Sequence, residues 1–136
     1  MVVVTIVALA VAAVVLAMPD PGGRVRDDAI RFAARVRAAQ EAAIVDARPV
    51  SIWVSAAGYG FDQQRGGAWQ AMSDRPLRVT PWSKGTRAIV AIGQGRDRVI
   101  FDSTGMADRP LRVRLLGSGR GAAVSIGATG AVRVDG

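Results

Sequence analysis

The sequence contains no cysteine and no histidine among its 136 residues. Without cysteine there is no disulfide framework and no thiolate nucleophile. Without histidine the commonest general base and the commonest metal ligand are missing. Acidic residues are also scarce, eleven against eighteen Lys and Arg, and they do not cluster as calcium ligands do. These shortages predict a protein that is not an enzyme and that needs no metal or cofactor.

The remaining candidates for chemistry are weak. Asp102 is followed by a Ser-Thr-Gly sequence, and an Asp in that position usually accepts hydrogen bonds from its own turn. The glycine-rich stretches 93–95 and 117–121 precede expected strands, whereas phosphate-binding loops open helices. We therefore assign no catalytic, cofactor-binding or metal-binding residue.

The first eighteen residues form a long apolar segment. They hold seventeen apolar side chains and Thr5, and Pro19 ends the run. Eighteen helical residues rise about 27 Å, close to the ~30 Å hydrocarbon layer of a bilayer. A cleaved secretory signal needs a basic n-region and a small-x-small site, and a buried core helix is rarely apolar on every face. We predict a transmembrane helix over 1–18. Its membrane and helix-core packing residues are Val2, Val3, Val4, Ile6, Val7, Leu9, Val11, Val14, Val15 and Leu16.

A breaker over residues 19–23, Pro-Asp-Pro-Gly-Gly, separates this segment from the rest of the chain. An amphipathic helix is predicted over 24–48, because apolar residues recur there at spacings of three and four. Arg24 and Asp28 form an i,i+4 pair off that stripe, and Arg48-Pro49 ends the helix. We expect the stripe to lie on a sheet. It consists of Val25, Ala29, Phe32, Val36, Ala39 and Ala43.

From Pro49 the apolar period changes to two, which predicts an antiparallel β domain over 49–136 with seven or eight short strands. Apolar residues alternate with polar ones over 50–54, 77–79 and 111–115, and short strands are expected at 86–92 and 97–101. A long helix before an antiparallel sheet makes the fold class α+β.

Several local sequences follow one another in an order that is more specific than the composition. They are Arg31 to Ile44 followed by Arg48-Pro49-Val50, then Gly67-Ala68-Trp69-Gln70, Arg75-Pro76-Leu77, Val99 to Ala107, and Ala123 to Val134. Together with the apolar helix they resemble the GspH/FimT-type minor pseudopilins, which are type IV pilin-like proteins. The resemblance covers essentially the whole chain and implies a pilin-like α+β fold.

In that family a short basic leader and a Gly-Phe-Thr-x-x-Glu motif precede the apolar run. The leader peptidase cuts after the glycine and methylates the new N-terminus, and the glutamate is thought to recruit the subunit to its neighbour. This sequence starts at Met1, where the motif would end, so the prepilin cleavage motif is missing upstream of Met1. As written, the chain is not expected to be processed, and no cleavage or glutamate position is assigned.

The resemblance implies a structural role as a minor pseudopilin of the type II secretion system, at or near the pseudopilus tip, in support of protein export across the outer membrane. The apolar helix would cross the bacterial inner membrane once, leaving the β domain in the periplasm. Its partners would be inner-membrane lipid before assembly and other pseudopilins afterwards, with secreted substrates or the outer-membrane secretin as further partners.

The net charge of +7 supports an alternative, a FimT-like minor type IV pilin that binds DNA through a basic face during uptake. The densest late cluster is Arg109, Arg112, Arg114 and Arg120, and Arg112 and Arg114 share one strand face. No aromatic residue lies between them for base stacking, and a solvated strand face is the ordinary interpretation. Nucleic acid is a partner only under this alternative.

Overall fold

The computed structural model describes residues 21–73, 77–90, 95–117 and 119–135, with the side chains of 21–23 excepted. The predicted transmembrane helix, its ten packing residues and Pro19-Asp20 lie outside the described residues. The described part of the chain forms one long helix, α2 (Pro21–Asp46), and nine strands. The strands are β1 (Val50–Ser55), β2 (Gly58–Arg65), β3 (Ala68–Ala71), β4 (Thr80–Pro81), β5 (Arg87–Ile89), β6 (Arg96–Phe101), β7 (Leu111–Gly117), β8 (Arg120–Ile126) and β9 (Val132–Asp135).

The helix differs from the prediction at both ends. It begins at Pro21, inside the predicted breaker, because proline suits the first helical turn, where its missing N–H would have no partner. It ends at Asp46, followed by Ala47 with a φ of 52°. The Arg48 N–H donates to the Ala43 carbonyl at 3.1 Å, and the Ala47 N–H donates to the Ile44 carbonyl at 3.3 Å. This pair of bonds is a Schellman motif, which turns the chain into β1 before the predicted end at 48.

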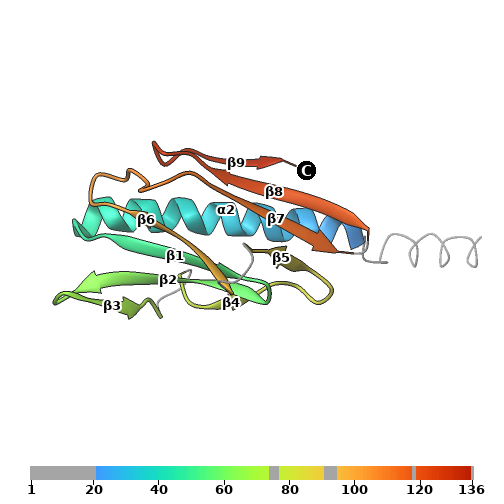
Figure 1. The fold of residues 1–136 in the computed structure, drawn as a ribbon, viewed down its shortest axis with the longest axis horizontal. Coiled ribbons are helices and arrows are strands. Elements are labelled where there is room, and N and C mark those ends of the chain that lie inside the picture. The colour runs from blue at the N-terminus through green and yellow to red at the C-terminus, as the bar shows by residue number, and fades with distance from the viewer. Residues whose placement is uncertain (1–20, 74–76, 91–94, 118, 136) are drawn as a thin grey trace, which may run out of the picture.

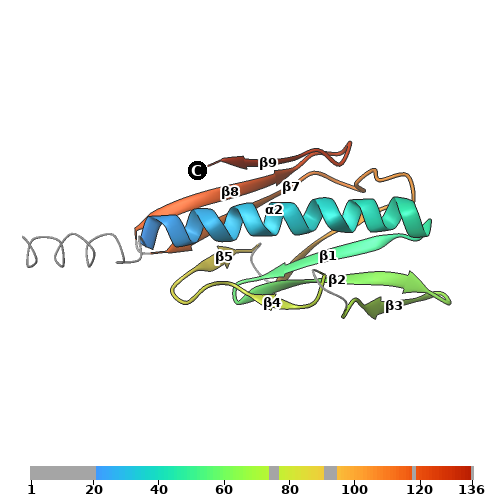
Figure 2. The same ribbon diagram turned by 180° about the vertical axis from the view of Figure 1, so that it is seen from behind.

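The strands form two antiparallel sheets, which confirms the α+β class (Figure 1). The five-stranded sheet, here called sheet A, has the order β3-β2-β1-β6, with β4 beside β2. The four-stranded sheet, here called sheet B, has the order β5-β7-β8-β9. Figure 2 shows α2 from the other side, lying along the length of the domain across the junction of the two sheets. One helix therefore supports both sheets.

The core forms where the helix stripe meets the inner faces of the sheets. All six predicted stripe residues are buried, which confirms that prediction, and Ala33 joins them. Inner residues of β1, β2 and β6 from sheet A and of β7 and β8 from sheet B together cover the buried face of α2. Phe32 lies at the centre of an aromatic cluster, with its ring centroid 4.8 Å from Tyr59 and 5.5 Å from Trp82. Such edge-to-face pairs add specific geometry to the apolar burial.

Two predicted strands differ from the structure. The alternation at 77–79 does not form a strand: Leu77 is buried, Val79 is 56 % exposed, and the nearby strand β4 holds only Thr80 and Pro81. Pro81 has no N–H, so this segment cannot continue as a ladder. The strand expected over 86–92 is shorter, β5 being Arg87–Ile89, and 91–92 lie outside the described residues. Within the described residues, no helix combines the length and apolarity that crossing a bilayer requires.

Candidate interaction surfaces

Two polar side chains of α2, those of Asp28 and Arg35, bind the segment before β5. The Asp28 carboxylate accepts from the Ser83 backbone N–H at 2.8 Å and from the Ser83 hydroxyl at 2.7 Å. Arg35 donates to the Tyr59 hydroxyl at 2.6 Å and to the Thr80 hydroxyl at 2.8 Å. Because Asp28 and Arg35 lie on the same helix that carries the apolar stripe, these bonds fix the 80–83 segment on the core.

Asp28 was expected off the stripe, paired with Arg24. Its side chain is instead almost fully buried, and its ion pair is with Arg31 at 3.8 Å. A buried carboxylate needs hydrogen-bond donors, and Ser83 supplies two of them. Asp28 is therefore part of the packing between α2 and its neighbouring loop.

Tyr59 is the single tyrosine of the chain. Burial raises the pKa of its hydroxyl, and the nearby Arg35 guanidinium offsets part of that rise through its charge and its hydrogen bond. The hydroxyl therefore stays protonated at neutral pH and serves as an acceptor for Arg35. This arrangement is a structural contact between β2 and the helix.

The Asp102 carboxylate binds its own turn, as the sequence predicted. One oxygen accepts from the Thr104 N–H at 2.9 Å, from the Thr104 hydroxyl at 2.5 Å and from the Met106 N–H at 3.1 Å. These bonds, the Thr104 hydroxyl first, lower the pKa of Asp102. The carboxylate shapes the loop between the two sheets. In the described part of the chain, no group of three or more acidic side chains is placed to hold a metal ion.

Arg109, the first of the four predicted DNA-binding arginines, lies on sheet A. Its Nε donates to the Arg98 carbonyl at 2.9 Å, and its Nη2 donates to the same oxygen. β6 is an edge strand of sheet A. The Asp108 carboxylate accepts a hydrogen bond from the Ile100 N–H at 2.9 Å, and the Asp108 backbone N–H donates to the Ile100 carbonyl at 2.9 Å. Arg109 thus covers backbone groups at an open sheet edge, which is a structural use of its charge.

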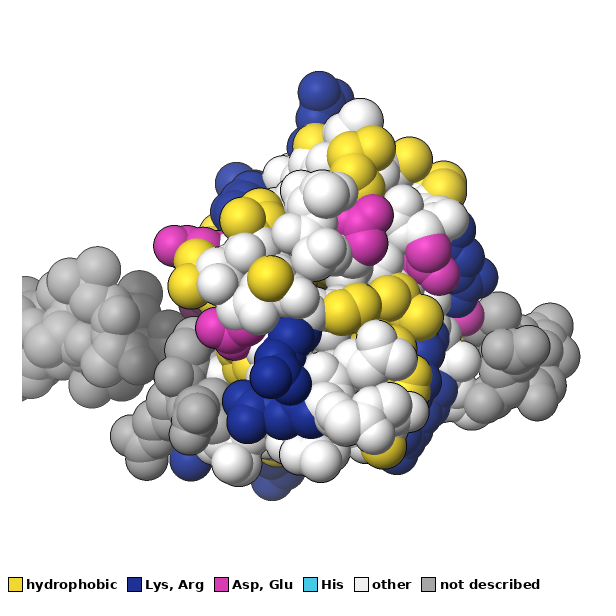
Figure 3. All heavy atoms as spheres, turned by 90° about the vertical axis from the view of Figure 1, so that its left-hand side faces the viewer, with side chains coloured by type: hydrophobic (Ala, Val, Ile, Leu, Met, Phe, Trp, Pro, Cys, Tyr) yellow, Lys and Arg dark blue, Asp and Glu magenta, His cyan; other side chains and the backbone are white. Residues whose placement is uncertain are grey.

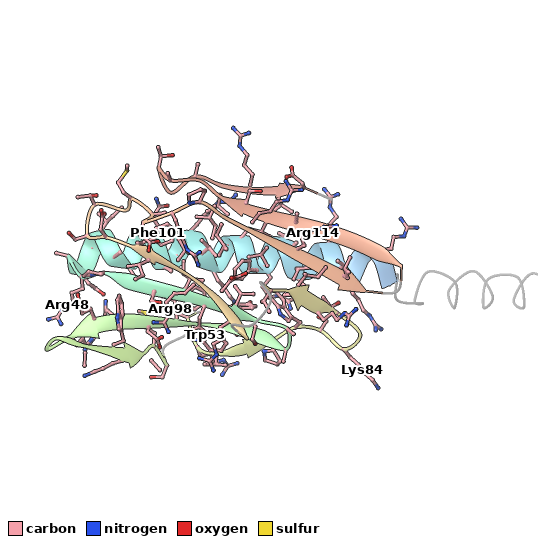
Figure 4. All side chains as sticks on the ribbon, in the orientation of Figure 1. Arg48, Trp53, Lys84, Arg98, Phe101 and Arg114 are labelled. Carbon is pink, nitrogen blue, oxygen red and sulfur yellow. The ribbon has the colours of Figure 1, made fainter. Side chains whose placement is uncertain are left out.

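Arg112 and Arg114 lie on the outer face of β7, as the shared-face prediction required. Both are exposed, whereas Val113 and Leu115 between and beside them are buried. Figure 4 shows Arg114 on this part of sheet B, away from Arg98 and Trp53 on sheet A. The two arginines border a shallow hollow of about 220 Å³.

Strand pairing adds a third arginine to this face. Arg112 lies opposite Ser125 of β8, and Ser125 lies opposite Arg133 of β9. In the same way, Arg114 of β7 lies opposite Ala123 of β8, and Ala123 lies opposite Asp135 of β9. We call Arg112, Arg114 and Arg133 the basic face of sheet B. The prediction from sequence missed Arg133, although its place between Val132 and Val134 in an alternating segment was a sign that it points outward.

Arg120 lies away from this face, at the opposite end of β8. It is paired with Gly117 and lines a larger hollow of about 660 Å³ together with Arg87 and Gly85. A side chain at Gly117 would come 2.8 Å from Val25 in the early part of α2. The four predicted arginines are therefore divided among three places: the edge of sheet A, the outer face of sheet B and the end of the domain where α2 begins.

The outer face of sheet A holds its own arginines. The Arg96 guanidinium lies 4.1 Å from the centroid of the Trp53 ring, and Arg98 forms an ion pair with Asp62 at 3.7 Å. Trp53 in turn packs over Gly60, where a Cβ atom would overlap the ring. No spacing along the chain indicates this arrangement, because all of these contacts join different strands.

The end of the domain where α2 stops carries exposed apolar side chains. Ile44, Val45 and Met106 are 50 %, 73 % and 46 % exposed. Figure 3 views this end and shows apolar side chains interspersed with acidic and basic ones. Gln40 donates to the Gly105 carbonyl at 2.8 Å, which holds the connection between β6 and β7 against the helix.

Comparison with known proteins matches residues 28–130 to a family model described as type II transport protein GspH. Among solved structures, the chain is similar to the minor pseudopilin EpsH of the type 2 secretion system of Vibrio cholerae, with a TM-score of 0.69 and 18 % identity over 82 % of this chain and 95 % of that one. A second crystal structure of EpsH from Vibrio cholerae has a TM-score of 0.68 and 17 % identity, over 85 % of this chain and 96 % of that one. The type IV minor pilin FimU of Pseudomonas aeruginosa has a TM-score of 0.62 and 15 % identity, over 84 % of this chain and 90 % of that one. No curated protein matches the chain.

Proposed function

The chain belongs to the GspH family of type II transport proteins, and we propose that it works as a structural minor pseudopilin of a type II secretion system. The observation that carries this proposal is the extent of the family match, which takes in most of α2 and the strands as far as the turn before β9. The similarity of its fold to the two EpsH structures supports it. No catalysed reaction and no cofactor are part of the proposal.

In this role residues 1–18 anchor the subunit in the bacterial inner membrane as a single pass, with the β domain in the periplasm. On assembly at or near the pseudopilus tip, the same segment packs against other pseudopilins. α2 supports such packing because only one side of it is covered by the sheets (Figure 2). Ile30, Ala34 and Val45 are exposed apolar residues of the helix, and they offer neighbours contacts interspersed with the charged side chains of Asp27, Arg37 and Glu41.

The proposal is tested by deleting the gene cleanly and measuring type II substrates in the culture medium. We expect export to fall sharply and to return when the full chain is supplied in trans. A complementing chain in which Val7 and Leu9 are both changed to Asp should not restore export, because charged side chains in an apolar helix are costly in a bilayer. Normal export in the deletion strain would contradict the proposal.

A second function, DNA capture in the manner of a FimT-like minor type IV pilin, has one observation in its favour. The basic face of sheet B exposes Arg112 and Arg114 on β7 and Arg133 on β9, with β8 between them, so that one face offers three cations to phosphate groups. If each arginine contacts one phosphate, the slope of log affinity against log salt should change by about 0.9 for each arginine removed.

This alternative is tested with duplex DNA and an Arg112→Glu, Arg114→Glu variant. The control is Arg26→Glu, Arg78→Glu, which changes the net charge equally at two exposed positions away from this face. DNA capture requires weaker binding and a shallower salt slope in the first variant only. Equal binding by both variants, or normal transformation in the deletion strain, would rule it out.

A further inference from the structure

Cations from four parts of the chain gather at the end of the domain where α2 begins. They are Arg24 in the first described turns of the helix, Lys84 in the loop before β5, Arg87 in β5 and Arg120 at the start of β8. All four are exposed. We call this group the basic collar.

Packing contacts establish that these residues share one end of the molecule. Arg24 and Lys84 border one hollow of about 480 Å³, and Arg87 and Arg120 border the neighbouring hollow of about 660 Å³. The two hollows adjoin at Gly117, which borders the larger one. A Cβ atom at Gly117 would come 2.8 Å from Val25, the residue after Arg24, and 2.8 Å from the carbonyl of Gly85, the residue after Lys84. Figure 4 shows Lys84 at this end and Arg48 at the opposite one.

The carboxylates near the collar do not neutralise it. Asp28 is turned inward to Ser83 and Arg31, which leaves Asp27 as the exposed carboxylate bordering these hollows in the described part of the chain. At the opposite end, cations and carboxylates are mixed (Figure 3). Arg48, Arg65 and Arg109 are exposed there together with four carboxylates, Glu41, Asp46, Asp102 and Asp108. The excess of cations therefore lies at the end where α2 begins.

The positive end is the one from which the chain continues toward the apolar segment. Pro21, the first residue of α2, follows Met18 by three positions. We propose that the basic collar docks on the anionic headgroups of the membrane that holds residues 1–18. This inference rests on the proposed function, because it takes that segment as the membrane anchor.

The chemistry fits a lipid surface. Arginine guanidinium groups bind phosphate oxygens through paired N–H donors, and long flexible cations on a shallow, open surface can follow many headgroups at once. A Lys or Arg beside an anionic bilayer gains roughly fivefold in binding, and the effect decays within a Debye length of about 8 Å at physiological salt. Four such residues at one end therefore favour contact between that end of α2 and the bilayer surface.

The test uses the full chain in nanodiscs and measures backbone amide hydrogen exchange by mass spectrometry. The probe is a bilayer with roughly a third phosphatidylglycerol, compared with phosphatidylcholine alone and with phosphatidylcholine plus soluble glycerol phosphate. We expect amides of 83–87 and 119–121 to exchange about tenfold more slowly in the phosphatidylglycerol discs only. Raising the salt to about 1 M should remove the protection.

The decisive variant is Lys84→Glu, Arg87→Glu, Arg120→Glu, which should lose this protection while amides of β1 remain as slow as before, showing that the domain is folded. The matched control is Arg112→Glu, Arg114→Glu, Arg133→Glu, which makes the same charge change on sheet B and should keep the protection. Equal exchange in the two lipids, protection by glycerol phosphate, or equal loss in the control would each overturn the proposal. Export is a separate measurement, so the collar can fail while the proposed function stands.

Discussion

The outer faces of the two sheets use arginine differently. On sheet A the two arginines of β6 contact side chains of other strands, Arg96 the Trp53 ring of β1 and Arg98 the Asp62 carboxylate of β2. On sheet B, the side chains of Arg112 and Arg114 extend from β7 and form no hydrogen bond or ion pair with any described residue. The strand sequences are alike, Arg-x-Arg in both cases, and the difference comes from what the adjacent strands place beside them.

This contrast separates two meanings of a basic strand. On sheet A the cations cover apolar and acidic side chains, so they contribute to packing and stability. On sheet B the cations face solvent, so their charge remains available for a partner. Matched changes on the two sheets test that division.

The largest difference is expected for glycines. Gly60 on sheet A lies under Trp53, and a Cβ atom there would overlap the ring, whereas a Cβ atom at Gly121 on sheet B would come no closer than 3.3 Å to any neighbour. We expect Gly60→Ala to lower the free energy of unfolding by about 2 kcal/mol, and Gly121→Ala to change it by less than about 1 kcal/mol. Denaturant unfolding of the two full-chain variants checks this, and equal losses would contradict the division.

A smaller difference is expected between Arg109 and Arg112. Removing the Arg109 side chain exposes the Arg98 carbonyl at the edge of sheet A, which should cost about 1 kcal/mol of stability. Arg112→Ala removes an exposed side chain and should cost less than about 0.5 kcal/mol. The same unfolding experiment compares them. If Arg112→Ala proves the more destabilising, the basic face of sheet B has a structural role that the structure does not show.

Of these contacts, the ion pair of Arg98 and Asp62 should contribute least to the free energy of unfolding at neutral pH. The Arg98 side chain is 43 % exposed, so solvent screens the pair, and a double-mutant cycle should give a coupling of about 0.5 kcal/mol. The same cycle applied to Arg114 and Asp135 on sheet B should give no measurable coupling. Added salt should reduce the first value, and a coupling that is insensitive to salt would show that packing, not charge, joins the pair.

Ionisation of Tyr59 should change the free energy of unfolding only at alkaline pH. Burial raises its folded pKa above the unfolded value of 10.0, so its contribution to stability is complete below pH 10 and is lost as the pH rises through the folded pKa. Because the chain has one tyrosine, the phenolate absorbance titrates Tyr59 alone. The midpoint should lie above that of the chain in denaturant. A lower midpoint would mean that the Arg35 charge outweighs burial.

Sequence reasoning succeeded where structure depends on local spacing. The stripe from Val25 to Ala43 follows from the helical period, and every predicted member is buried. Asp102 was predicted to bond its own turn because the residues concerned are two and four positions away. The α+β class followed from the change of period at Pro49. Each of these inferences needed only residues close together in the chain.

It failed where the answer depends on which strands are neighbours. Arg109 and Arg98 are eleven residues apart, and Asp28 and Ser83 are fifty-five apart, so no spacing rule connects them. Arg133 joins Arg112 only through the register of three strands. A cluster counted along the sequence therefore mixed one edge residue, two face residues and one residue of the basic collar.

The position of α2 has a mechanical consequence. Its 26 residues rise about 39 Å, and both sheets are attached along its flank by the buried stripe. A pull along the helix axis would load the attachments of both sheets in shear, so many side-chain contacts would have to slide at once. Peeling a sheet from one end would break them one after another. A domain built in this way resists force along the helix axis more strongly than force that separates a sheet from one end.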